Sequence, residues 1–130
     1  MAEQVPINIP VVIIDPNRAW QEALVGHLAA AGYASRCFVA GEAALRFIES
    51  HPNAFVVADY KSVRKMGVDL KRLCHGRGTR SKVILLIESR NPSLVRDCFR
   101  AGAFDCLVKP RDKQGLATFM ESTVRPCFAS

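Results

Sequence analysis

The chain has 130 residues, of which 49% are hydrophobic and 23% are charged. This length suits one domain with a single core, and the composition excludes an intrinsically disordered chain. No apolar run approaches the roughly 20 residues that a membrane-spanning helix needs, and the N-terminal MAEQVPINIP lacks the basic start of a signal peptide. We therefore expect a cytoplasmic protein with a lead-in over residues 1–9, a domain over 10–125 and a C-terminal tail over 126–130.

Five short apolar runs predict β-strands. They cover residues 11–14, 34–39, 54–58, 82–87 and 105–108. The run at 82–87, KVILLI, is continuous and apolar, which is typical of a central strand buried on both faces.

Helical patterns alternate with these strands. The first opens at Asp15-Pro16-Asn17 and ends at Gly32, because an acidic or amide cap followed by proline starts a helix and glycine ends one. A second helix is expected over Gly41–Ser50, and a third over about 68–75, closed by Gly76 and Gly78. A fourth runs from Asn91 to Ala103, with inward residues Leu94, Val95, Cys98 and Phe99. The fifth runs from Asp112 to about Val124, and Pro126 is expected to stop it. The basic stretch 59–66 is predicted to be a loop.

Strict alternation of strands and helices predicts an α/β fold. Right-handed crossovers then require a doubly wound, three-layer (βα)5 sandwich with a parallel sheet. We expect the flavodoxin-like strand order 2-1-3-4-5. Three apolar runs end in charged residues, namely Asp15, Asp59 and Lys109. Ligands of such sheets bind at the carboxyl ends of the strands, so these side chains could hold a divalent cation and a phosphoryl group there. Asp15 could instead cap the first helix.

The net charge is +6, and basic residues concentrate between Lys61 and Lys82. Such a stretch is typical of a surface for an acidic partner or for nucleic acid. Apart from Tyr60 no aromatic residue interleaves the charges, and no base-reading motif appears. We interpret the stretch as a solvated face that helps to select a docking partner, and we do not expect direct nucleic-acid binding.

The chain has five cysteines, Cys37, Cys74, Cys98, Cys106 and Cys127. Their number is odd and their spacing is not that of a metal site. Most lie in apolar runs, where a free cysteine acts as a small hydrophobic residue. We therefore expect free thiols rather than a disulfide framework.

These motifs together resemble the receiver domain of bacterial response regulators in two-component signalling. The segment AGAFDCLVKP, residues 101–110, is similar to the "AGA…KP" segment of that family, and Gly67 lies eight residues after Asp59, where the family usually has glycine. The resemblance implies that Asp59 is the phosphoacceptor and that Lys109 contacts the phosphoryl group. It also implies Mg²⁺ held by Asp15, Asp59 and the backbone carbonyl of Lys61, with a histidine kinase or phosphotransfer protein as donor and an effector domain or another protein as partner.

The chain departs from the family pattern at the positions that bind metal and relay the signal. The second acidic position after the first strand is Pro16, and the proline four residues after the phosphoacceptor is replaced by Val63. The switch positions, usually Thr or Ser and an aromatic residue, are Ile87 and Cys106. Glu88 follows Ile87, where it could intrude on the site or supply the missing carboxylate.

These departures favour an atypical, non-enzymatic receiver that acts as a phosphorylation-independent interaction module. The alternative is a receiver modified on Asp59 by a histidine kinase with Mg²⁺. A flavodoxin-like nucleotide-binding domain is disfavoured, because no Gly-rich loop follows the first strand. A homodimer through the fourth helix, fifth strand and fifth helix is a further hypothesis, with charges from Arg96, Asp97, Arg100, Asp105, Arg111 and Lys113. Trp20 is expected to pack on its helix face.

Overall fold

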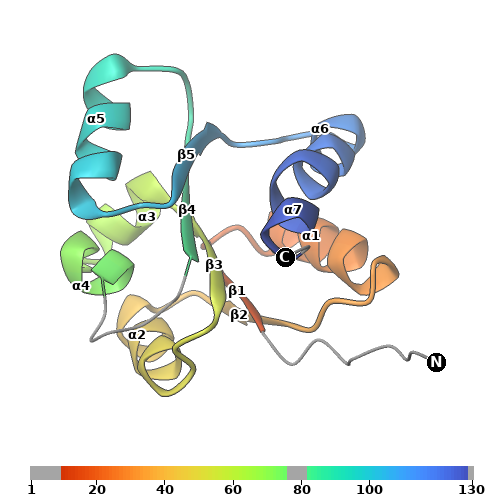
Figure 1. Ribbon diagram of the computed structural model, residues 1–130, viewed down its shortest axis with the longest axis horizontal. Coiled ribbons are helices and arrows are strands. Elements are labelled where there is room, and N and C mark those ends of the chain that lie inside the picture. The colour runs from red at the N-terminus through yellow and green to blue at the C-terminus, as the bar shows by residue number, and fades with distance from the viewer. Residues whose placement is uncertain (1–9, 76–81, 129–130) are drawn as a thin grey trace.

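The computed structural model describes residues 10–75 and 82–128. Its centre is a parallel sheet in the order β2-β1-β3-β4-β5 (Figure 1). The strands are β1 (Val11–Ile14), β2 (Ser35–Phe38), β3 (Phe55–Asp59), β4 (Lys82–Ile87) and β5 (Asp105–Val108). The doubly wound fold and the strand order predicted from the sequence are confirmed.

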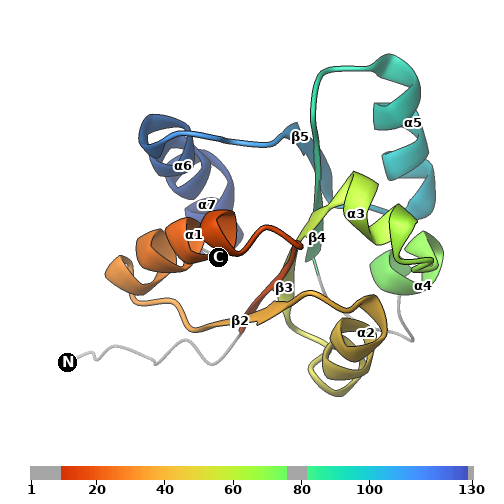
Figure 2. The same ribbon diagram turned by 180° about the vertical axis from the view of Figure 1, so that it is seen from behind.

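Helices cover both faces of the sheet. The elements are α1 (Arg18–Ala30), α2 (Gly41–Ser50), α3 (Tyr60–Lys65), α4 (Leu70–His75), α5 (Pro92–Ala101), α6 (Lys113–Phe119), the π-helical η1 (Met120–Val124) and α7 (Arg125–Phe128). Helices α1, α6 and α7 lie on one face, and α2 to α5 lie on the other (Figures 1 and 2). Within the described ranges, no helix is both long and apolar enough to cross a bilayer.

The sheet separates two hydrophobic cores. Alternate residues of β1 supply them: Val12 and Ile14 join the core under α2 to α5, whereas Val11 and Ile13 join the core under α1 and α6. Side chains of successive strand residues point to opposite faces, so a strand buried on both faces must be apolar at every position. All six residues of β4 except the first are buried, which explains its uninterrupted apolar sequence.

The stretch predicted as a basic loop contains a helix. Helix α3 starts directly after β3, with Asp59 as its N-cap. The prediction assigned Asp59 to the phosphoryl and metal site and did not consider that its side chain could also cap a helix. The next helix, α4, begins at Leu70 rather than near residue 68, and the proposed closing residues Gly76 and Gly78 lie outside the described residues.

Two helix predictions near the C-terminal half are also wrong. Pro126 does not stop the last helix, because the helical segment continues from α6 through the π-helical η1 and past Pro126 to Phe128. Phe99 is 47% exposed. The buried residues of α5 are Cys98 and Ala101, and Phe99 lies one residue off the stripe that faces the sheet.

Candidate functional site

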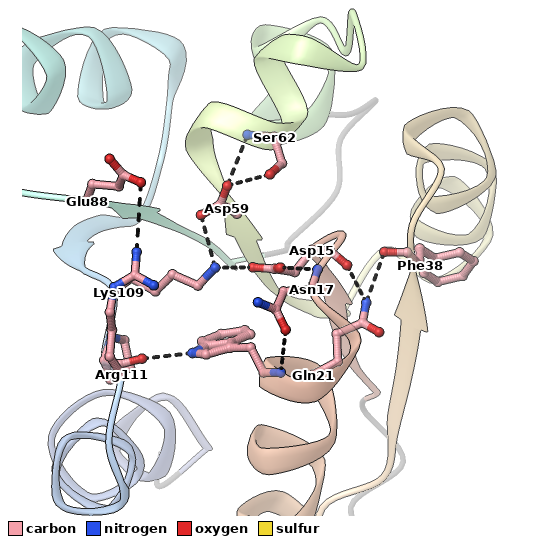
Figure 3. Close-up of polar contacts among 11 residues, drawn as sticks. Asp15, Asn17, Gln21, Phe38, Asp59, Ser62, Glu88, Lys109 and Arg111 are labelled. Carbon is pink, nitrogen blue, oxygen red and sulfur yellow. Dashed lines mark hydrogen bonds and ion pairs between the residues drawn. The ribbon is translucent and has the colours of Figure 1, made fainter.

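Lys109 joins the ends of β1 and β3. Its ammonium group lies 2.5 Å from Asp15 Oδ2 and 3.3 Å from Asp59 Oδ1 (Figure 3). Asp15 follows β1, Asp59 ends β3 and Lys109 follows β5, so all three stand at the carboxyl edge of the sheet. The sequence prediction that these residues converge is confirmed by the geometry, while their roles remain predictions.

Asp15 is held firmly by its surroundings. Asp15 is only 1% exposed. Its second carboxylate oxygen, Oδ1, accepts a hydrogen bond from the Asn17 backbone N–H at 2.8 Å. The buried amide of Gln21 donates to the Asp15 backbone carbonyl at 2.6 Å. The cap of α1 is Asn17, whose side chain accepts from Trp20 N–H at 2.9 Å, so the alternative that Asp15 caps this helix is wrong.

Asp59 is both a site residue and a helix cap. Its Oδ2 accepts from the backbone N–H of Ser62 at 3.0 Å and from the Ser62 hydroxyl at 2.5 Å. With Lys109 on Oδ1, each carboxylate oxygen of Asp59 already has a donor. Ser62 was not identified from the sequence, although Asp is a preferred N-cap residue and Asp59 could have indicated a helix start there.

Trp20 forms the other wall around Lys109. The Lys109 ammonium lies 4.6 Å from the centroid of the Trp20 ring, a distance at which the ring face attracts a cation. The indole N–H donates to the carbonyl of Pro110 at 2.8 Å. Trp20 is buried as expected, but its contact with the site lysine was not predicted, because helical periodicity shows which face of α1 is buried and not which loop that face contacts.

The two switch positions are apolar and packed. Ile87 is 3% exposed and Cys106 is 9% exposed, and both belong to the core under α2 to α5. The side chain of Ile87 has no hydrogen-bonding group, so it cannot donate a hydrogen bond to a phosphoryl oxygen. Burial raises the pKa of the Cys106 thiol, which keeps it a neutral core group.

Glu88 is directed toward Arg111, with 3.9 Å between Oε2 and the guanidinium Nη2 (Figure 3). Both side chains are more than half exposed, so the pair contributes little to stability. Glu88 does line the cavity that contains Asp15 and Asp59. It pairs with Arg111 and contributes no oxygen to the contacts among Asp15, Lys109 and Asp59.

The cluster opens into a cavity of about 550 Å³ with a mixed charge lining. Its basic residues are Lys61, Lys65, Lys109 and Arg111, and its acidic residues are Asp15, Asp59 and Glu88. A Mg²⁺ ion is bound through one or two carboxylates and several waters, so it needs carboxylate oxygens that are free to bind it. Here basic residues outnumber acidic ones.

The arrangement does not fit a Mg²⁺ ion. The four carboxylate oxygens of Asp15 and Asp59 already accept from Lys109, Asn17 and Ser62. Lys61 is the second residue of α3, and a carbonyl there points along the helix to accept from the residue four positions on. Among the residues that the structure describes, no group of three or more His, Cys, Asp or Glu side chains could hold a metal.

The fold and the site together define a class of protein. A doubly wound sheet that brings two carboxylates and a lysine to its carboxyl edge is the framework of a receiver-type signalling module. A family model described as a response regulator receiver domain matches residues 11–121. The chain belongs to this family and is the receiver domain of a two-component response regulator. Members of the family are signalling modules that interact with histidine kinases and effector domains and in general bind Mg²⁺.

Individual relatives agree with this assignment. The chain is 27% identical over 118 residues to the two-component response regulator ORR27 of Oryza sativa subsp. japonica, and the match covers 91% of this chain and 19% of that protein. The chain thus spans about a fifth of the length of this relative. A response regulator from Thermotoga maritima has a TM-score of 0.78 at 20% identity, covering 95% of this chain and 100% of its own.

Two further solved structures are similar. A putative response regulator from Chloroflexus aurantiacus J-10-fl has a TM-score of 0.70 at 25% identity, covering 94% of this chain and 98% of its own. A response regulator from Burkholderia pseudomallei, solved with a phosphorylated aspartic acid, a calcium ion and citrate, has a TM-score of 0.69 at 17% identity, covering 94% and 72%. The second likeness shows a shared fold.

Proposed function

We propose that this receiver domain binds its partner without phosphorylation of Asp59. The observation that carries the proposal is the occupation of both Asp59 oxygens, Oδ1 by Lys109 and Oδ2 by Ser62. A carboxylate must present a free oxygen to attack a phosphoryl donor. Here Oδ2 of Asp59 would first have to break its hydrogen bonds to the hydroxyl and the backbone N–H of Ser62 at the start of α3. Losing an N-cap costs about 0.5–2 kcal/mol.

The relay from the acceptor is interrupted as well. In the family a hydroxyl at the end of the fourth strand moves onto the phosphoryl group, and an aromatic side chain on the fifth strand follows it. Ile87 and Cys106 occupy these positions as packed core residues. A covalent event at Asp59 would therefore lack the two-state element that communicates it to the surface.

The runner-up is a receiver that accepts a phosphoryl group on Asp59 from a histidine kinase with Mg²⁺. The distance of 3.3 Å between Lys109 Nζ and Asp59 Oδ1 favours it, because a lysine there can neutralise phosphoryl charge. The misfit of Mg²⁺ to the engaged oxygens weighs against it.

Intact mass spectrometry after incubation with acetyl phosphate and millimolar MgCl₂ distinguishes the two functions. We expect no phosphoryl adduct on the wild-type chain. Ser62→Ala frees Asp59 Oδ2 from the hydroxyl, and Pro16→Asp/Ile87→Thr supplies the missing carboxylate and hydroxyl, so a triple variant with all three changes should gain the adduct. Asp59→Asn in that background is the matched control and should lose it. A stoichiometric adduct on wild-type Asp59 would establish the runner-up instead.

A further inference from the structure

A groove between α3 and α5 runs beside the site. It has a volume of about 600 Å³, and the apolar side chains that line it on this face of the sheet are Tyr60, Ile87 and Leu94. Both helices lie on the same face of the sheet (Figure 2). A cavity of this size and lining accommodates one or two side chains of a bound segment.

One rim of the groove is strongly basic. Lys61, Arg64 and Lys65 line it, and their spacing of three and four residues places them on one side of α3. All three are exposed. Within the described part of the chain, none of them forms an ion pair with an acidic side chain. The Tyr60 hydroxyl fixes the orientation of the Arg64 side chain, because the guanidinium donates a hydrogen bond to it at 3.0 Å.

The opposite rim has fewer acidic side chains than the α3 rim has basic ones. Asp97 of α5 and Glu88 line it, and Glu88 already faces Arg111. The cations of α3 therefore outnumber the acids available to neutralise them. Because unpaired like charges on one helix face repel each other, an acidic ligand on this rim gains attraction and relieves repulsion.

We propose that the groove binds a short segment of a partner protein in which acidic residues flank a large apolar side chain. The apolar side chain lies on Ile87 and Leu94, and the acidic residues lie along Lys61, Arg64 and Lys65. The inference rests on the proposed function, since a groove that borders Asp59 and needs no phosphoryl group is the surface such a receiver requires.

Charge and shape decide against the other occupants. A second copy of the chain is disfavoured, because each copy has a net charge of +6. Nucleic acid would match the basic rim, but it would leave the apolar lining of Tyr60, Ile87 and Leu94 without a partner. A segment with both acidic and apolar side chains satisfies both parts of the groove.

The test uses the 130-residue chain and a capped peptide, Glu-Asp-Leu-Phe-Glu-Asp, followed by amide NMR. We expect shifts concentrated in α3 and the first half of α5. Two reference peptides, one with all acids replaced by their amides and one with Leu and Phe replaced by Ser, should each bind at least about tenfold more weakly, because each removes one of the two attractions.

Charge variants locate the interaction. Lys61→Glu/Arg64→Glu/Lys65→Glu should reduce affinity by about tenfold or more, whereas Arg18→Glu/Arg46→Glu/Lys113→Glu changes the net charge equally at exposed positions outside the groove and should have an effect of about threefold or less. The milder Lys61→Gln/Lys65→Gln keeps Arg64 on Tyr60 and covers the case in which the triple variant fails to fold. It should still bind at least about threefold more weakly than wild type.

Several results would overturn the proposal. These are the absence of peptide shifts in α3 and α5, equal losses in both charge-reversal variants, or displacement of the peptide by a DNA duplex that binds the same amides more tightly. Repeating the titration after acetyl phosphate treatment separates the two claims. Binding that appears only on phosphorylated protein refutes the proposed function and keeps the groove as the binding site, whereas no binding in either state refutes the groove alone.

Discussion

The ammonium group of Lys109 lies against the ring of Trp20, 4.6 Å from its centroid, while the Trp20 N–H donates to the neighbouring Pro110 carbonyl at 2.8 Å. The indole N–H of Trp20 thus binds the loop after β5, and the face of its ring contacts the Lys109 ammonium group. This places the cation between Asp15 and Asp59. The indole is a structural part of the site although it carries no charge.

Substitutions at Trp20 separate its two contacts. Trp20→Phe keeps an aromatic face but loses the hydrogen bond to Pro110, and it should lower the free energy of unfolding by about 1–2 kcal/mol. Trp20→Leu also loses the cation–π contact and should cost about 0.5–1 kcal/mol more. Urea unfolding at neutral pH measures both. Equal stability of the two variants would show that the ring face contributes nothing to holding Lys109.

Removal of Lys109 should destabilise the protein strongly. Lys109→Met leaves Asp15, which is 1% exposed, without its counter-ion, and breaking a buried pair this way costs about 3–5 kcal/mol. The double variant Asp15→Asn/Lys109→Met removes the stranded charge and should recover a large part of the loss. Lys113→Met, at an exposed lysine on α6, is the control and should change stability by no more than about 0.5 kcal/mol. A Lys109→Met variant as stable as this control would contradict the interpretation.

Magnesium binding should depend on residue 16. The wild-type chain should show little perturbation of amide NMR signals near Asp15 and Asp59 at millimolar MgCl₂, because the carboxylate oxygens there already have donors. Pro16→Asp supplies an extra carboxylate and should bind the ion more tightly, by about tenfold or more. Pro16→Asn has the same shape without the charge and should behave like wild type. Strong wild-type binding would mean that Lys109 and Ser62 release these oxygens readily.

The buried thiols should make stability fall at alkaline pH. Burial raises the pKa of Cys74 from 9.0 to about 11, so the unfolded chain loses this proton at lower pH than the folded chain does. The contribution of the neutral thiol is fully present below pH 9.0 and is lost as the pH rises toward about 11. Unfolding free energies of wild type and Cys74→Ala across this window should converge as the pH rises, and a constant difference would contradict the assignment.

Thiol labelling gives an independent check of the same burial. Under native conditions at pH 8, iodoacetamide should modify the exposed Cys37 and leave Cys74, Cys98 and Cys106 protected. Labelling in denaturant, where all thiols are accessible, is the control. Rapid modification of Cys98 in the folded protein would place it in a more open environment than the structure does.

Sequence reasoning predicted the architecture almost completely. Five apolar runs alternating with helices and right-handed crossovers predict a doubly wound sheet. The order 2-1-3-4-5 is one of the common orders of such sheets, and it predicts that Asp15, Asp59 and Lys109 meet at one edge. Predictions failed where one residue had two possible uses. Asp59 is predicted as an acceptor and is also a helix cap, and Pro126 is predicted to end the last helix but lies within α7, which continues η1.

The amino-acid sequence by itself thus determined which charged groups reach the carboxyl edge of the sheet, because strand period and helix crossover are local or chiral constraints. Only the tertiary structure decided how their atoms pair. Lys109 pairs with Asp15 across 94 residues, Trp20 packs on the lysine, and Glu88 faces Arg111 instead of Asp59. Such choices depend on side-chain geometry and burial in the assembled molecule, where competing partners differ by a few kcal/mol or less.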